Sequence, residues 1–219
     1  MRFIISLILL LLLGSAAFMW WPKPLVQWEQ EFVKIGTFSS PRAADLNADG
    51  IKDIIIGAGA AEFEAADTAV IALDGKNGDI LWAVGAIDQI FGNPVLLDIN
   101  EDNTEDVIIS GRSGQLLAID GKTGALLWDF KRDHQLDFEL YNVYTPAVLA
   151  DQDGDGLPDL LVAQGGDVSK KPFETDRPAG MLMLLCRLNG ALLAYDTMPD
   201  GKETYMSPVT IVREGETQI

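Results

Sequence analysis

A nine-residue, aspartate-rich motif recurring at a constant interval constrains this chain more than any other feature of its sequence. Asp45-Leu-Asn-Ala-Asp-Gly-Ile-Lys-Asp53 returns as Asp98-Ile-Asn-Glu-Asp-Asn-Thr-Glu-Asp106 and again as Asp151-Gln-Asp-Gly-Asp-Gly-Leu-Pro-Asp159. The first aspartates of successive copies lie 53 residues apart both times. A fixed period of this length indicates a repeat architecture in which each copy is one supersecondary unit.

The residues around each motif predict strands. Each motif is preceded by proline and followed by a short run of branched aliphatic residues that ends at glycine, as in Ile54-Ile55-Ile56-Gly57. Such runs between turn signals are typical of buried strands. A second unit at 70–82 and 116–128 predicts a hairpin with an Asp-Gly turn and a closing tryptophan. A third copy at 185–195 reads as a hairpin with its turn shortened to Asn189-Gly190.

One period therefore holds about four short strands, which is typical of a propeller blade. We expect an all-β chain, a β-propeller with blades at about 25–85, 86–135 and 136–200 and part of a fourth at 201–219. Closed propellers typically use about 4–8 blades. We therefore expect this stretch to be a piece of a larger propeller, one of about seven or eight blades.

Residues 1–21 differ from the rest of the chain and predict export. An apolar run from Ile4 to Leu13 follows Arg2, and small residues at 14–17 suit cleavage of a signal peptide. Residues 4–21 are also just long enough for an uncleaved membrane anchor, and both interpretations stay open. Either interpretation places the chain after residue 21 in the periplasm, at the cell surface or outside the cell.

The net charge limits the classes of partner that the chain can bind. The value of −17 disfavours nucleic acid and anionic lipid, so membrane contact is expected only through the N-terminal segment. Cys186, the only cysteine, lies in an apolar run and is expected to be a buried, inert thiol, so no internal disulfide can form.

The motif itself predicts calcium. Oxygen atoms at positions one, three, five and nine, with the carbonyl of position seven, can supply the 6–8 oxygen ligands that calcium takes. The expected ligands are Asp45, Asn47, Asp49, Ile51 and Asp53; Asp98, Asn100, Asp102, Thr104 and Asp106; and Asp151, Asp153, Asp155, Leu157 and Asp159. An EF-hand is excluded because position twelve falls in an aliphatic strand instead of being glutamate.

No zinc or copper site is expected, because the three motifs hold no Cys or His. As calcium sites the three motifs differ in how many of the expected residues they contain. The third has aspartate at every side-chain position, the first has Asn47, and the second has Asn100 and also Asn103 where glycine is expected at position six. We expect up to three structural Ca²⁺ ions, with affinity falling in the order third, first, second motif.

These residues resemble two known families. The aspartate loops followed by Ile54-Ile-Ile-Gly-Ala-Gly59 are similar to the FG-GAP repeats of integrin α-chain propellers and their bacterial relatives. The hairpins ending in Trp82 and Trp128 resemble the tryptophan-docking repeats of quinoprotein (PQQ-type) propellers. The resemblance covers about residues 25–219 and implies a calcium-binding propeller at the cell surface that adheres to proteins or glycans.

The functional expectation is a non-catalytic module that binds an extracellular protein or glycan. His134 is the only histidine and lies in a polar link, so no histidine-based catalytic group is expected. Trp82 and Trp128 are expected to pack between blades. Extra polar residues at 167–179 form an insertion, either a tolerated surface loop or a binding loop. The alternatives are part of a quinone-dependent dehydrogenase, a polysaccharide-acting enzyme or a surface scaffold.

Overall fold

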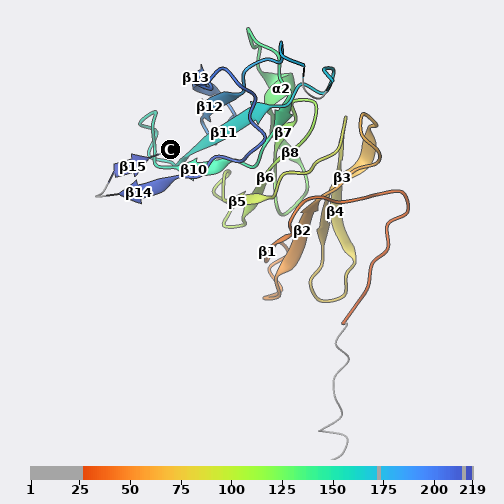
Figure 1. The fold of residues 1–219 in the computed structure, drawn as a ribbon. Coiled ribbons are helices and arrows are strands. Elements are labelled where there is room, and N and C mark those ends of the chain that lie inside the picture. The colour runs from red at the N-terminus through yellow and green to blue at the C-terminus, as the bar shows by residue number, and fades with distance from the viewer. Residues whose placement is uncertain (1–26, 172–173, 214–215, 219) are drawn as a thin grey trace, which may run out of the picture.

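The computed structural model describes residues 27–171, 174–213 and 216–218, and it is a β-propeller built from antiparallel sheets (Figure 1). The predicted export segment at residues 1–21 lies outside the described residues. Within the described part of the chain, no helix is both long and apolar enough to cross a membrane.

Three sheets follow one another along the chain, as the repeat predicts. The first holds β1 (Arg42–Ala44), β2 (Asp53–Gly57), β3 (Ala66–Leu73) and β4 (Ile80–Ala86) in that order. The second holds β5 (Val95–Leu97), β6 (Asp106–Ser110), β7 (Leu116–Ile119) and β8 (Leu126–Asp129). The third holds β10 (Ala147–Leu149), β11 (Asp159–Gly165), β12 (Met181–Leu185) and β13 (Leu192–Thr197). We refer to these sheets as blades one, two and three.

Smaller elements complete the chain. β9 (Asn142–Val143) pairs with the far end of β11, and α2 (Phe130–Asp133) is a single helical turn after blade two. β14 (Ile211–Arg213) and β15 (Glu216–Gln218) form a two-stranded hairpin beyond blade three. The prediction of four-stranded blades is confirmed, with an aspartate motif between the first two strands of each blade and a hairpin formed by the last two.

The hydrophobic core lies between adjacent blades. Successive side chains of a strand point to opposite faces, and in β6 the residues Val107 and Ile109 belong to a cluster shared with blade one. Ile108 between them belongs to a cluster shared with blade three. All five residues of β6 are buried, which explains why its central residues, 107–109, are all aliphatic with no polar alternation.

The hairpin turns of the three blades have the same length, so the prediction of a shortened third turn is wrong. In each, the N–H of the fifth residue donates to the carbonyl of the first: Gly78 to Asp74, Gly124 to Asp120, and Gly190 to Cys186. Cys186 therefore occupies the position held by aspartate in the other two turns. The Asp-Gly signal is lost from the third copy while the backbone of the turn is kept.

Each of these turns receives a tryptophan from the preceding segment of the chain. The indole Nε1 of Trp82 in blade one donates to the carbonyl of Gly121 at 2.7 Å, and Trp128 of blade two donates to Arg187 at 3.0 Å. The predicted packing of Trp82 and Trp128 between blades is thereby confirmed. Trp28, which the sequence interpretation did not include, makes the equivalent bond to Gly75 at 3.0 Å. The equivalent position on β13, paired with Leu184, is Ala194.

The insertion at 167–179 ties blade three to the segment that follows it. Arg177 pairs with Glu203 at 2.5 Å, and both side chains are largely buried, with relative exposures of 16% and 8%. Arg177 also donates to the carbonyls of Asp167, Lys170 and Lys171. The described residues of the insertion therefore fold onto the protein as an organised strap.

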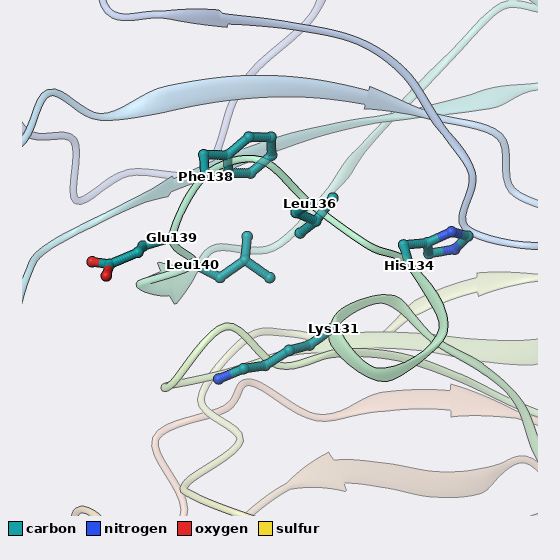
Figure 2. A pocket seen from close by; sticks show the side chains of 6 residues that line it. All are labelled: Lys131, His134, Leu136, Phe138, Glu139 and Leu140. Atoms are coloured by element: carbon teal, nitrogen blue, oxygen red, sulfur yellow. The ribbon is translucent and has the colours of Figure 1, made fainter.

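A hollow of about 400 Å³ lies beside the link between blades two and three (Figure 2). Its apolar lining is Leu136, Phe138 and Leu140, and its polar lining is Lys131, His134 and Glu139. His134, expected in an exposed loop, is half-buried, and its Nε2 lies 3.1 Å from the carbonyl oxygen of Asn189 in the third turn. The lone histidine of the chain thus helps to join blades two and three.

Candidate functional site

The three aspartate motifs adopt one conformation, held by hydrogen bonds from the backbone to the motif's own side chains. In the first loop, Asp45 accepts from the N–H of Asp49 and of Gly50, and Asp49 accepts from the N–H of Ile51. The second loop repeats this pattern from Asp98. In the third, Asp151 accepts from Gly154 at position four in place of position five, and again from Gly156 at position six, while Asp155 accepts from Leu157. The repeat in sequence is therefore a repeat in three dimensions.

This conformation needs two residues at positive φ, at positions four and six. The first loop has Ala48 (60°) and Gly50 (83°), the second has Glu101 (61°) and Asn103 (67°), and the third has glycine at both, each at 87°. The left-handed region costs a residue with a Cβ roughly 1–2 kcal/mol, and glycine nothing comparable. The third loop is therefore the least strained and the second the most strained. The sequence interpretation recognised position six and missed position four.

The aspartate at position nine is buried and links parts of its own blade. Asp53, Asp106 and Asp159 are at most 1% exposed. In each, one carboxylate oxygen accepts from the N–H of position two: Leu46 at 2.8 Å, Ile99 at 2.8 Å and Gln152 at 2.6 Å. In the first two blades the other oxygen accepts from the hairpin glycine, Gly75 at 3.0 Å or Gly121 at 2.9 Å.

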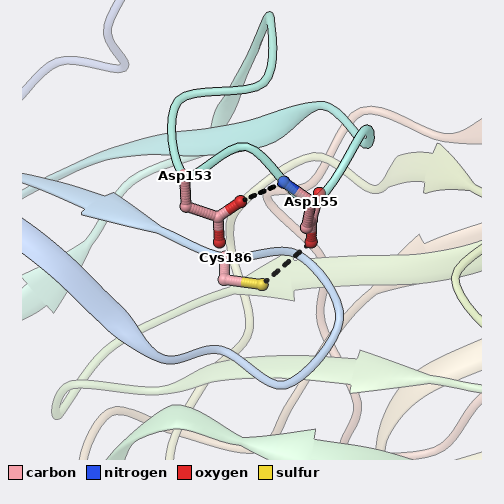
Figure 3. Close-up of side chains that lie close together, drawn as sticks. All are labelled: Asp153, Asp155 and Cys186. Carbon is pink, nitrogen blue, oxygen red and sulfur yellow. Dashed lines mark hydrogen bonds between the residues drawn. The ribbon is translucent and has the colours of Figure 1, made fainter.

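Position three contacts the hairpin turn, and here the third blade departs from the other two. Asn47 donates to Asp74 at 3.4 Å, and Asn100 donates to Asp120 at 2.8 Å. In blade three, position three is Asp153 and the turn residue is Cys186, whose Sγ lies 3.7 Å from Oδ2 of Asp155 (Figure 3). The hydrogen bond between an amide and a carboxylate in blades one and two is thus replaced, at the same place in blade three, by carboxylates beside a thiol.

The carboxylates converge most closely in the third loop. Oxygens of Asp151, Asp153 and Asp159 lie within 4.8 Å of one another, as do oxygens of Asp153 and Asp155 and the Sγ of Cys186. Within the described ranges, no other three Asp, Glu, His or Cys side chains come together this closely. Asn47 and Asn100 replace one carboxylate in each of the other loops. All the predicted side-chain ligands lie in the described part of the chain, on these three loops.

The electrostatics of the third loop favour a bound cation. Burial raises the pKa of Asp159, and the neighbouring charges of Asp153, Asp155 and Asp151 raise it further. Hydrogen bonds from Gly154 and Gly156 hold the pKa of Asp151 below its usual range, so this carboxylate stays charged. A cation placed among these groups would relieve their mutual repulsion.

The donor set fits a hard cation, even though a cysteine lies beside it. Burial raises the pKa of the Cys186 thiol, and the charges of Asp153 and Asp155 act in the same direction, so it stays protonated at neutral pH. A thiol in that state is a weak hydrogen-bond donor toward Asp155 and not a thiolate ligand. The oxygen atoms that remain suit calcium. The sequence interpretation placed no cysteine here, because Cys186 is 31 residues from Asp155 and only folding brings the two together.

Comparison with known proteins identifies a related family. The family model described as the FAM234A/B beta-propeller matches residues 28–171. Protein FAM234B of Gallus gallus is 27% identical over 178 residues, covering 76% of this chain and 27% of that protein. Protein FAM234A of Bos taurus is 29% identical over 159 residues, covering 64% and 28%. Protein FAM234A of Mus musculus is 23% identical over 161 residues, covering 65% and 29%. The chain spans less than a third of the length of these relatives.

Proposed function

This chain belongs to the FAM234A/B β-propeller family, and from that premise we propose that it is a calcium-braced, non-catalytic binding module of an exported protein. Calcium would bind in the aspartate loops, most tightly in the third, and its role would be structural. The bound partner would be an extracellular protein or glycan. We propose adhesion at the cell surface as the purpose of this binding, on the ground of the resemblance to FG-GAP and quinoprotein-type propellers.

The observation that carries the calcium proposal is the convergence of carboxylates in the third loop. Three of them place oxygens within 4.8 Å of one another, on a backbone that has glycine at both left-handed positions. Asp151, Asp153, Asp155 and Asp159 would supply the side-chain oxygens, with Leu157 supplying its carbonyl. Calcium bound there would neutralise repelling charges between the first two strands of the blade.

The proposal is tested by the melting temperature of the chain in calcium and in chelator. A site with a Kd of about 0.1 mM, within the range of extracellular modules, gains about 2.7 kcal/mol at roughly 10 mM calcium. For a chain of this size that corresponds to a rise of roughly 5–10 °C in Tm. Isothermal titration calorimetry would count the ions bound.

Asp153→Asn is the matched variant, because it recreates the asparagine that loops one and two carry at position three. An asparagine oxygen can still accept the N–H bond of Asp155 that Asp153 accepts at 3.0 Å. In chelator the variant should melt no lower than the wild type, because it has one repelling charge fewer, and it should lose most of the calcium-dependent rise. An equal rise in both proteins would remove the third loop from the proposal, and no rise in the wild type would end the calcium proposal.

A further inference from the structure

The repeat places one aromatic side chain per blade around a single pocket. Phe38, Phe91 and Tyr144 lie 53 residues apart, each just before the first strand of its blade, and Tyr205 precedes β14. All four line a cavity of about 460 Å³, within the range of roughly 300–1,000 Å³ typical of small-molecule sites. No metal loop contributes to its lining.

The segments that carry these aromatic residues are tied together by hydrogen bonds. The N–H of Ser40 donates to Asn93 at 2.7 Å, and the N–H of Asn93 donates to Thr145 at 2.8 Å. The rings of Phe91 and Tyr144 meet edge to face at 5.6 Å. The pocket therefore spans three blades and has a preorganised wall.

Much of the aromatic surface faces solvent. Phe38 is 78% exposed and Tyr205 is 58% exposed, which is unusual for rings gathered at one cavity. A ring presents a flat apolar face, and Tyr adds a hydroxyl at its edge. Such a surface can stack on a ligand that is itself a flat ring with apolar C–H groups.

Polar atoms of two further residues are available to a ligand. Asn142 is only 7% exposed, and its amide nitrogen makes a long bond of 3.4 Å to the carbonyl of Gly166. Within the described part of the chain its Oδ1 has no hydrogen-bond donor, and the Nη1 of Arg112 likewise has no acceptor. Neither atom is fully buried, so a ligand in the pocket can reach both.

The charges of the pocket are already balanced. Arg112 pairs with Glu62 at 2.5 Å and lies 5.8 Å from the centre of the Phe91 ring, while Arg177 pairs with Glu203 at 2.5 Å. An anionic ligand would have to compete with these carboxylates and approach a chain of net charge −17. The pocket therefore favours a ligand without charge.

We propose that this pocket binds a neutral oligosaccharide, a ligand class that rests on the proposed function as a binding module. The sugar rings would stack on Phe38, Tyr144 and Tyr205, and their hydroxyls would bond to Asn142 Oδ1 and Arg112 Nη1. Sugars match this lining because each ring combines an apolar face with hydroxyls that both donate and accept. A peptide helix is less suited, because the lining is mainly aromatic and charged side chains and not the continuous apolar groove that a helix fills.

The test uses the chain in calcium, applied to a glycan array that carries neutral and sialylated oligosaccharides, followed by calorimetry with the best neutral binder. Phe38→Ala is the informative variant, because a side chain 78% exposed can be removed without disturbing the fold. It should weaken binding at least tenfold. Ile80→Ala is the matched control, since Ile80 is an exposed apolar residue on β4 outside the pocket (47% exposed), and it should bind as the wild type does.

The outcomes separate the pocket from the proposed function. Loss of neutral-sugar binding in Phe38→Ala alone supports the proposal. Sugar binding unaffected by Phe38→Ala overturns the pocket while leaving a binding module, and preference for sialylated sugars overturns the charge argument. No sugar binding, with Phe38-dependent capture of peptides from a displayed random library, overturns the ligand class. Sugar binding that persists without any calcium binding overturns the calcium role and leaves the pocket in place.

Discussion

Replacing Trp82 tests whether the docked tryptophans hold neighbouring blades together. Trp82 is 7% exposed, and its Nε1 donates to the carbonyl of Gly121 in blade two at 2.7 Å. Trp82→Phe keeps most of the packed ring and leaves that carbonyl without its donor. Because an unsatisfied buried polar group costs about 1–3 kcal/mol, we expect a loss of roughly 2 kcal/mol in the free energy of unfolding. Trp82→Ala removes the ring as well and should cost about 3–5 kcal/mol.

The assay is urea denaturation followed by far-ultraviolet circular dichroism, at fixed calcium concentration so that metal linkage does not change between variants. Trp28→Phe is the comparison, because Trp28 makes the same bond from a half-buried position and should lose less. If Trp82→Phe unfolds within about 0.5 kcal/mol of the wild type, the hydrogen bond between the blades contributes little and the reasoning fails.

Other predictions follow from particular contacts. Arg177→Gln leaves the Glu203 carboxylate without its partner and should lower the urea midpoint of unfolding, whereas an unchanged midpoint would show that the strap does not brace the fold. Burial alone would raise the pKa of Glu203, but bonds from Arg177, Tyr205 and the N–H of Asp167 outweigh it and hold the pKa below its ordinary value of 4.5. This contribution is present above pH 4.5 and is lost as pH falls through the lowered pKa, so the wild type should lose its advantage over Arg177→Gln in acid; a constant difference down to pH 3 would contradict this. In Gly121→Ala the new Cβ would lie 1.9 Å from the carbonyl oxygen of Glu105, so Tm should fall by several degrees, more than in Gly154→Ala, where only a φ of 87° is strained.

The fold could be predicted because its signal is periodic. Three copies of the aspartate motif and two of the tryptophan hairpin repeat what a blade needs: a loop, aliphatic strands and tight turns. Blade three shows where this reasoning fails. Its hairpin has lost the Asp-Gly signal, yet Cys186 and Gly190 close a turn of the same length. Trp128 and His134 both contact this turn, although the local sequence no longer indicates it.

The aspartate loops could also be located from sequence, because their ligands are consecutive residues and their geometry is local. The need for a left-handed residue at position four was missed, because Ala48 and Glu101 are not residue types that indicate this conformation, as glycine is. Trp28 was missed as well, because no Asp-Gly turn precedes it in the sequence as one precedes Trp82 and Trp128.

The repeat, the blade and the position of each acidic loop could thus be predicted from the residues alone, since all three depend on residues close together in the chain. Which residues far apart in the chain meet was visible only in the folded protein. Cys186 and Asp155 are 31 residues apart, Arg177 and Glu203 are 26 apart, and successive aromatic residues of the pocket are 53, 53 and 61 apart. Those contacts depend on how the strands of a blade pair and how one segment packs against the next, which no local pattern of residues encodes.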